Sequence, residues 1–125
     1  MWQHSDAIVV KRVKGKGRGV FARRPIAEGT VIERVPVILV PLPSVMEPGS
    51  ILSRFCFLRN RKTAALALGY GSIYNHSYHP NATYEEDGPE AMLFRALSTI
   101  GKGEEITINY NGAPRDRAAV GFRVV

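Results

Sequence analysis

The chain has 125 residues, 45% of them hydrophobic, and a net charge of +6, which fits one globular domain and excludes a largely disordered chain. Its single cysteine, Cys56, excludes an internal disulfide and a cysteine-rich zinc site. No apolar run reaches the ~20 residues of a membrane span, and the N-terminus is too polar and short for a signal peptide, so we expect an intracellular protein, cytoplasmic or nuclear.

Short β-strands are predicted for the first half of the chain. Residues 7–13 are rich in β-branched side chains, and a glycine-punctuated turn follows at 14–19. Residues 20–40 predict a strand, a turn and a second strand, which Pro36 should break into two pieces or place at a sheet edge. Residues 41–50 hold three prolines and predict a loop.

The second half continues this pattern. Residues 51–58 and 63–69 are apolar and fit either a short helix or a buried strand. Residues 81–87 and 90–98 predict a hairpin joined by a glycine-proline turn, and 105–110 alternate apolar and polar residues as a half-buried strand does. The predicted fold class is mostly β.

The charged residues are segregated along the chain. Seven of the 17 lysines and arginines fall between Lys11 and Arg24, where no acid interrupts them. This strip is either a solvated basic face or a contact for nucleic acid. An acidic group lies further on and comprises Glu85, Glu86, Asp87 and Glu90. Such segregation suits a basic partner held at an acidic cleft.

Single motifs leave alternatives open. Gly15, Gly17 and Gly19 fit a turn that needs positive φ, and no helix follows them as a dinucleotide-binding fingerprint requires. Asn75 and His76 could bind a ligand, although a histidine packed in the core would explain His76 alone. No set of metal ligands at suitable spacing accompanies His76, so we expect no metal site.

Three segments taken in order carry more information than any one of them. They are GKGRGVF at 15–21, GYGSIYNHSYHPNATY at 69–84 and GKGEEITINY at 101–110. Together they resemble the SET-domain protein lysine methyltransferases, which show G-x-G near the start, N-H-S-x-x-P-N in the middle and G-E-E-[LI]-T-x-x-Y near the end. The resemblance runs from about Ile8 to Asn111. The chain is similar in particular to stand-alone viral and bacterial SET proteins that lack zinc-binding flanking regions.

The resemblance implies a fold and an activity. The fold is a β-clip of short curved sheets and short helices with a C-terminal pseudoknot, here one SET domain over 1–125 with its core at about 8–111 and a tail at 112–125. The activity is S-adenosylmethionine-dependent methyl transfer to the side-chain amine of lysine in a basic protein, a histone or histone-like protein being the candidate. The viral-type relatives form homodimers, so a dimer is expected too.

The resemblance also assigns residues. Six would contact the cofactor: Lys16, Gly17, Arg18, Asn75, His76 and Phe122. Phe122, in the tail, would cover the adenine, while Pro80 and Asn81 would fix the turn after the site. Tyr110 matches the catalytic tyrosine and Tyr84 a tyrosine of the lysine channel. Phe55 or Phe57 would supply the aromatic channel residue that the viral-type relatives carry near Cys56.

Two other functions fit part of the sequence. Residues 24–32, RPIAEGTVI, also resemble non-catalytic β-clip domains that bind sugars or act as structural caps. The basic strip from Lys11 to Arg24 would fit a nucleic-acid binder, alone or in combination with catalysis.

Overall fold

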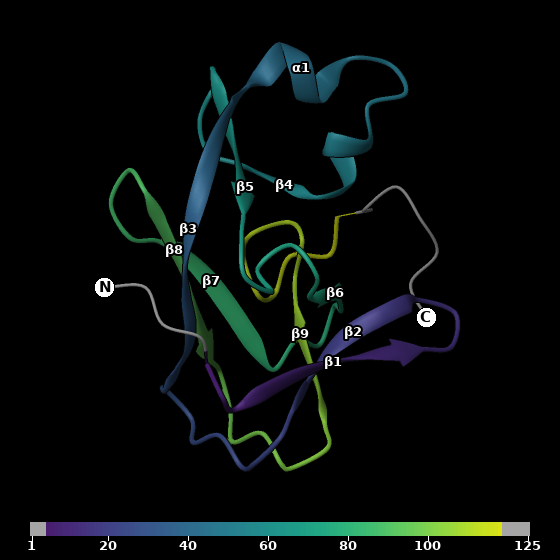
Figure 1. Ribbon diagram of the computed structural model, residues 1–125, viewed down its shortest axis with the longest axis vertical. Coiled ribbons are helices and arrows are strands. Elements are labelled where there is room, and N and C mark those ends of the chain that lie inside the picture. The colour runs from purple at the N-terminus through teal and green to yellow at the C-terminus, as the bar shows by residue number, and fades with distance from the viewer. Residues whose placement is uncertain (1–4, 119–125) are drawn as a thin grey trace.

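Two β-sheets form the framework of the structure, a computed structural model that describes residues 5–118 (Figure 1). The four-stranded sheet has the order β1 (Ile8–Val13), β2 (Gly17–Ala22), β9 (Glu105–Ile108) and β6 (Asn75–His76). The five-stranded sheet has the order β4 (Cys56–Leu58), β5 (Thr63–Ala67), β3 (Val31–Pro41), β8 (Ala91–Ala96) and β7 (Ala82–Glu86). The predicted mostly β fold of short, curved sheets is confirmed.

Two predicted hairpins are present. Strands β1 and β2 pair antiparallel from Ile8 opposite Ala22 to Val13 opposite Gly17. Gly15 and Gly17 have φ values of 82° and 81° in the turn, which explains why glycine is used there. Strands β7 and β8 form the second hairpin.

The prediction that Pro36 breaks its strand is wrong. Strand β3 is continuous, and it pairs with β8 up to Pro36 and with β5 from Val37 onward. The proline lies where the strand changes partner, so its missing N–H removes no ladder hydrogen bond. Its carbonyl still accepts a 3.0 Å hydrogen bond from the Leu68 N–H.

The loop predicted at 41–50 contains a short helix, α1 (Leu42–Met46). A proline lies in its first turn, where a helix tolerates the missing donor because that N–H has no partner within the helix. The ambiguous segment 51–58 divides into a 3₁₀ helix, η1 (Ile51–Arg54), and strand β4, while 63–69 supplies strand β5. No helix among residues 5–118 has the length and apolar character needed to cross a membrane.

Strand β9 packs into the core and lies between strands β2 and β6. Ile106 and Ile108 are fully buried, as the alternating pattern predicts. One edge of β9 pairs antiparallel with β2, and the other pairs in parallel with β6. Figure 1 shows the chain after β9, in yellow, curling beside the loop that carries β6. Threading of the tail as a pseudoknot stays a prediction.

Candidate active site

A cleft of about 620 Å³ opens beside the β1–β2 hairpin. Its lining includes residues from all three sequence motifs: Lys16, Gly17, Arg18, Asn75 and Tyr110. These residues are up to 94 positions apart in the chain, from Lys16 to Tyr110. They meet because β9 lies between β2 and β6 in one sheet.

The side-chain amide of Asn75 connects three segments at the base of this cleft. Its Nδ2 donates to the Arg18 carbonyl at 2.8 Å and to Glu105 Oε2 at 2.7 Å. The other oxygen of Glu105 accepts from Lys16 Nζ at 3.2 Å, and both side chains of this ion pair are only 18% exposed. Asn75 therefore fixes the hairpin against β6 and β9.

Gly19 leaves the space that this network occupies. A Cβ added there would clash with Glu105 Oε2 and lie 2.8 Å from Asn75 Nδ2. A side chain at position 19 would have to shift the end of the Glu105 or Asn75 side chain, so the third glycine of the first motif permits the observed geometry of this network.

Tyr110 is anchored at both its backbone and its hydroxyl. Its N–H donates to His76 Nδ1 at 3.0 Å, and its hydroxyl donates to the Tyr74 carbonyl at 2.6 Å. Burial, and next the negative charge of Glu105, raise the pKa of Tyr110 to about 12, while a hydrogen bond with the His76 backbone acts the other way. The hydroxyl is therefore protonated near neutral pH and acts as a donor.

His76 lies behind the cleft and outside its lining. Its side chain is 3% exposed, and its ring packs edge-on against Tyr78 with 4.5 Å between centroids. Burial, and secondarily the charge of Lys16, lower its pKa. This favours the neutral imidazole, whose Nδ1 can accept the Tyr110 N–H. The expected contact of His76 with a cofactor stays a prediction.

Tyr74 is fixed by contacts with Phe94 and Glu33. Its ring is 1% exposed and stacks on Phe94 with 4.6 Å between centroids, and its hydroxyl donates to Glu33 Oε1 at 2.8 Å. Burial, and next the charge of Glu33, raise the pKa of Tyr74 well above its usual value. The carbonyl that receives the Tyr110 hydroxyl thus belongs to a tightly packed residue.

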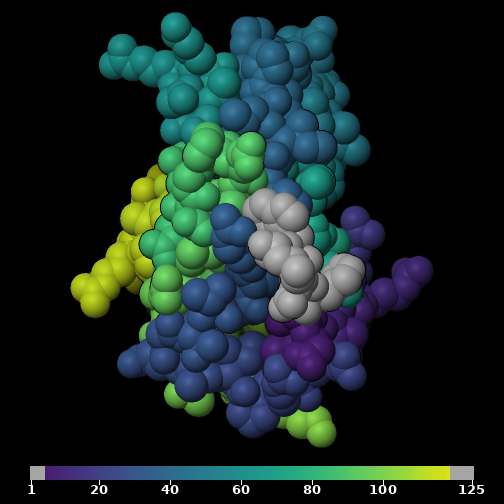
Figure 2. Space-filling view, turned by 60° about the vertical axis from the view of Figure 1, so that its left-hand side comes forward, coloured from purple at the N-terminus to yellow at the C-terminus, as the bar shows by residue number. Residues whose placement is uncertain are grey.

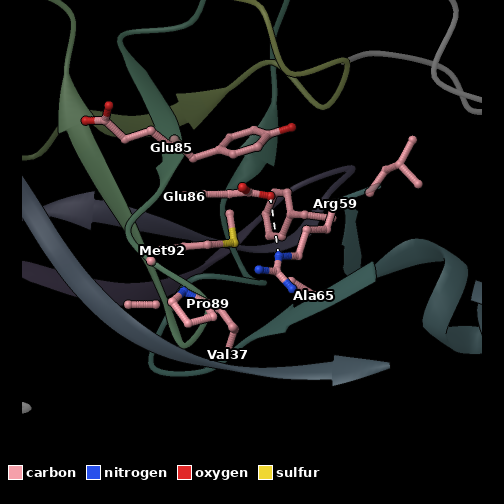
Figure 3. Close-up of a pocket in the computed structure, with 12 residues that line it drawn as sticks. Val37, Arg59, Ala65, Glu85, Glu86, Pro89 and Met92 are labelled. Carbon is pink, nitrogen blue, oxygen red and sulfur yellow. Dashed lines mark ion pairs between the residues drawn. The ribbon is translucent and has the colours of Figure 1, made fainter. Parts of the chain in front are cut away.

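The expected channel residue Tyr84 lies outside the cleft and lines a second cavity of about 180 Å³, shown in Figure 3. Its ring is 4.6 Å from that of Phe57, which lines the same cavity, whereas Phe55 lines the larger cleft. The Tyr84 hydroxyl is 3.6 Å from the position of a Cβ on Gly112, two residues beyond Tyr110. Arg59 and Glu86 form an ion pair at the rim, 3.7 Å apart (Figure 3).

Several structural contributors were not identified as site residues from the sequence. They are Gly19, Glu33 and Glu105, whose contacts depend on segments far apart in the chain. Asn81 was expected only to fix a turn, yet its side chain also binds β9, donating to the Glu105 carbonyl and accepting from the Thr107 N–H. The expected adenine cover, Phe122, lies outside the described residues.

Comparisons with known proteins agree with this geometry. The family model of the SET domain matches residues 17–111, which include the lining residues of the three motifs from Gly17 onward. The chain is 33% identical over 104 residues to a histone-lysine N-methyltransferase of Schizosaccharomyces pombe described as specific for lysine 37 of histone H3, covering 81% of this chain and 71% of the relative.

A solved structure gives a similar result. It is a Plasmodium falciparum protein described provisionally as a histone methyltransferase, with a TM-score of 0.71 and 29% identity, covering 86% of this chain and 94% of that one. The expected class of enzyme, a protein-lysine methyltransferase, is therefore confirmed, and the chain belongs to the SET-domain family.

Proposed function

We propose that the protein transfers a methyl group from S-adenosylmethionine to the side-chain amine of a lysine in a basic protein, with a histone or histone-like protein as the substrate. The observation that carries this proposal is the meeting of Lys16, Gly17, Arg18, Asn75 and Tyr110 at one cleft. The S. pombe relative, which is described as acting on histone H3, supports the substrate class.

The size and the chemistry of the cleft support the proposed cofactor. Its volume of about 620 Å³ lies within the range of small-molecule sites, about 300–1,000 Å³. Gly17 places no side chain over its mouth, and the lysine and arginine side chains at its wall suit the carboxylate of the cofactor. Lys16, Gly17, Arg18 and Asn75 would hold the cofactor, which supplies an electrophilic methyl group on a sulfonium.

Tyr110 would orient the reacting groups. Because its pKa is raised to about 12, its hydroxyl stays protonated and is a poor base near neutral pH. The substrate amine, with a reference pKa of ~10.4, must lose its proton before it can attack. A buried site disfavours the charged ammonium, so positioning and desolvation account for activation without a strong protein base.

The second cavity would bind the side chain of the substrate lysine. The rings of Tyr84 and Phe57 form an aromatic wall suited to the aliphatic part of a lysine side chain. The acidic group beside it is largely balanced, because Glu85, Glu86 and Asp87 pair with Arg95, Arg59 and Arg34. Recognition of a basic peptide there would therefore require exchange of these ion pairs.

Calorimetric titration with S-adenosylmethionine tests the cofactor assignment. The wild-type protein should bind saturably, and Asn75→Ala should weaken binding at least tenfold because the Arg18 carbonyl loses its bond to β6 and Glu105 loses its amide donor. Asn111→Ala, which removes an amide outside the cleft lining, should bind as the wild type does. Absence of binding by folded wild-type protein, with and without substrate present, would favour a non-catalytic β-clip module.

We also propose a homodimer. Six of the nine large hydrophobic side chains that are exposed among the described residues lie between Ile38 and Leu58, and patches of this kind mark protein contacts. In Figure 2 this part of the chain, blue to teal, forms the upper end of the molecule. Sedimentation velocity should show a dimer, and Met46→Ser should weaken its association. A wild-type protein that stays monomeric at high concentration would contradict the proposed dimer.

A further inference from the structure

The β1–β2 hairpin carries cations that the fold does not neutralise. Two of the seven between positions 11 and 24 form ion pairs, Lys16 with Glu105 and Arg24 with Asp6. The other five have no ion pair with an acid of residues 5–118, and all five are exposed: Lys11, Arg12, Lys14, Arg18 and Arg23. Figure 2 shows the purple side chains of this region projecting from one edge of the molecule.

The acids of the β7–β8 hairpin, in contrast, are mostly paired with cations. Three of the four acids in the group at 85–90 pair with arginines that come from three separate segments. Charge pairing is therefore available in this fold, and it neutralises three of the four acids in that group. The positive charge of the β1–β2 hairpin is left open to a partner.

The register of the hairpin strengthens this point. Arg12 lies directly opposite Arg18, and like charges in directly opposed positions destabilise a β-pair. No acid within the described residues pairs with either side chain. Because the pair opposes folding, a binding role gives a physical reason for its presence.

We propose that this hairpin docks the enzyme on the phosphate backbone of duplex DNA without reading its sequence. The exposed lysine and arginine side chains of the hairpin and its base could provide the phosphate contacts that dominate such binding. A membrane surface is the poorer fit, because the hairpin shows none of the large exposed apolar side chains recorded for residues 5–118. Its aromatic ring, Phe21, lies beneath Lys11, with Nζ 5.6 Å from the ring centroid.

The proposed DNA site overlaps the cleft in part. Lys11, Arg12 and Arg18 belong to both, whereas Lys14 and Arg23 lie outside the cleft lining. DNA docked through the hairpin would bring the cleft close to proteins already bound to that DNA. DNA binding is measured without cofactor or substrate, so its failure would leave the proposed methyl transfer untouched.

Fluorescence anisotropy of a labelled random-sequence duplex, titrated over a salt series, tests the proposal. With five phosphate contacts, a plot of the logarithm of the association constant against the logarithm of the salt concentration should have a slope of roughly −4 to −5. The double variant Lys14→Gln/Arg23→Gln should weaken binding about tenfold or more at low salt and make the slope shallower by about 2. Its affinity for S-adenosylmethionine should equal that of the wild type.

The matched control is Arg61→Gln/Lys62→Gln. It removes the same charge from two exposed residues between β4 and β5, at the upper left in Figure 1 and away from the hairpin, and should bind DNA as the wild type does. An equal loss in both variants would mean that net charge, not the hairpin, is responsible. If the double variant does not fold, Lys14→Gln alone should remove about one unit of slope.

Three other outcomes would overturn the assignment. They are a wild-type affinity that is flat with salt, tighter binding to phosphatidylserine vesicles than to DNA, and equal affinity for polyglutamate at matched charge. The first outcome would show that phosphate contacts do not dominate binding. The second would indicate a membrane surface as the partner, and the third would indicate an acidic protein.

Discussion

The Tyr110 hydroxyl donates a 2.6 Å hydrogen bond to the backbone carbonyl of Tyr74, the residue directly before Asn75. This contact joins the residue proposed to orient the substrate amine to the segment proposed to hold the cofactor. Tyr74 is itself fixed by Phe94 and Glu33. The position of the Tyr110 hydroxyl therefore depends on residues outside the cleft lining.

Tyr110→Phe should lower turnover about 10²-fold or more and change cofactor affinity less than about threefold. The reason is that a positioned hydroxyl acts on the reacting groups, while the ring still fills the site. Steady-state kinetics and calorimetry measure the two effects. Tyr78→Phe removes a hydroxyl that bonds the Ala118 carbonyl instead and should retain turnover. Equal losses of turnover and binding in Tyr110→Phe would make Tyr110 a structural residue.

Tyr74→Phe should lower the free energy of unfolding by about 1–3 kcal/mol, because Glu33 loses a donor to its carboxylate. Urea denaturation measures this change. Tyr70→Phe removes a hydroxyl from a half-buried tyrosine and should change stability by less than about 0.5 kcal/mol. If Tyr74→Phe is as stable as Tyr70→Phe, the bond between Tyr74 and Glu33 does not stabilise the site.

Gly19→Ala should weaken cofactor binding about tenfold, because its Cβ would clash with Glu105 and crowd Asn75. Calorimetric titration with S-adenosylmethionine gives the affinity, and a thermal melt checks folding. Gly101→Ala is the matched control, since its Cβ would meet only the end of the exposed Glu104 side chain at 2.8 Å. Normal binding by Gly19→Ala would show that the amide network can move without cost.

Turnover should rise as pH increases from about 7 to 10, since the substrate amine loses its proton over this range. The raised pKa of Tyr110, about 12, keeps its hydroxyl protonated throughout, so no alkaline decline from Tyr110 is expected below about pH 12. Single-turnover rates over this range test the prediction. A flat profile with methyl transfer rate-limiting would contradict it.

Stability should fall as pH drops below about 6.5. The pKa of His76 is lowered in the folded protein, so the unfolded chain takes up the proton first and is favoured until the folded His76 is also protonated. Urea midpoints between about pH 7.5 and 5.5 measure this loss. His76→Asn, whose side-chain oxygen could accept the Tyr110 N–H, should flatten the profile; an unchanged profile would assign the loss to another group.

The local parts of the fold were predictable from the sequence. Glycine turns and alternating residues predicted the β1–β2 and β7–β8 hairpins and strand β9, and all are present. The continuous β3 was not predicted, because the effect of Pro36 depends on which strands lie beside it. Local pattern contains no information about that exchange of partners.

The site was predictable only as far as its motifs extend. Resemblance to the family indicated Asn75 and Tyr110, and the structure brings both to one cleft. Glu105 and Glu33 were missed because their partners lie 30 and 41 residues away, in segments that only the folded chain brings together. An acid at the first position of the alternating strand 105–110 was the only local sequence feature at Glu105.

The most direct test of the proposed function is mass spectrometry of histone H3 and of isolated basic peptides after incubation with the protein and S-adenosylmethionine. The proposal predicts methylated lysine that forms in proportion to enzyme, is lost with Tyr110→Phe and persists with Tyr78→Phe. Absence of methylated lysine on every basic substrate, by protein that binds the cofactor, would contradict it. Methylation that survives unchanged in Tyr110→Phe would place the chemistry elsewhere in the chain.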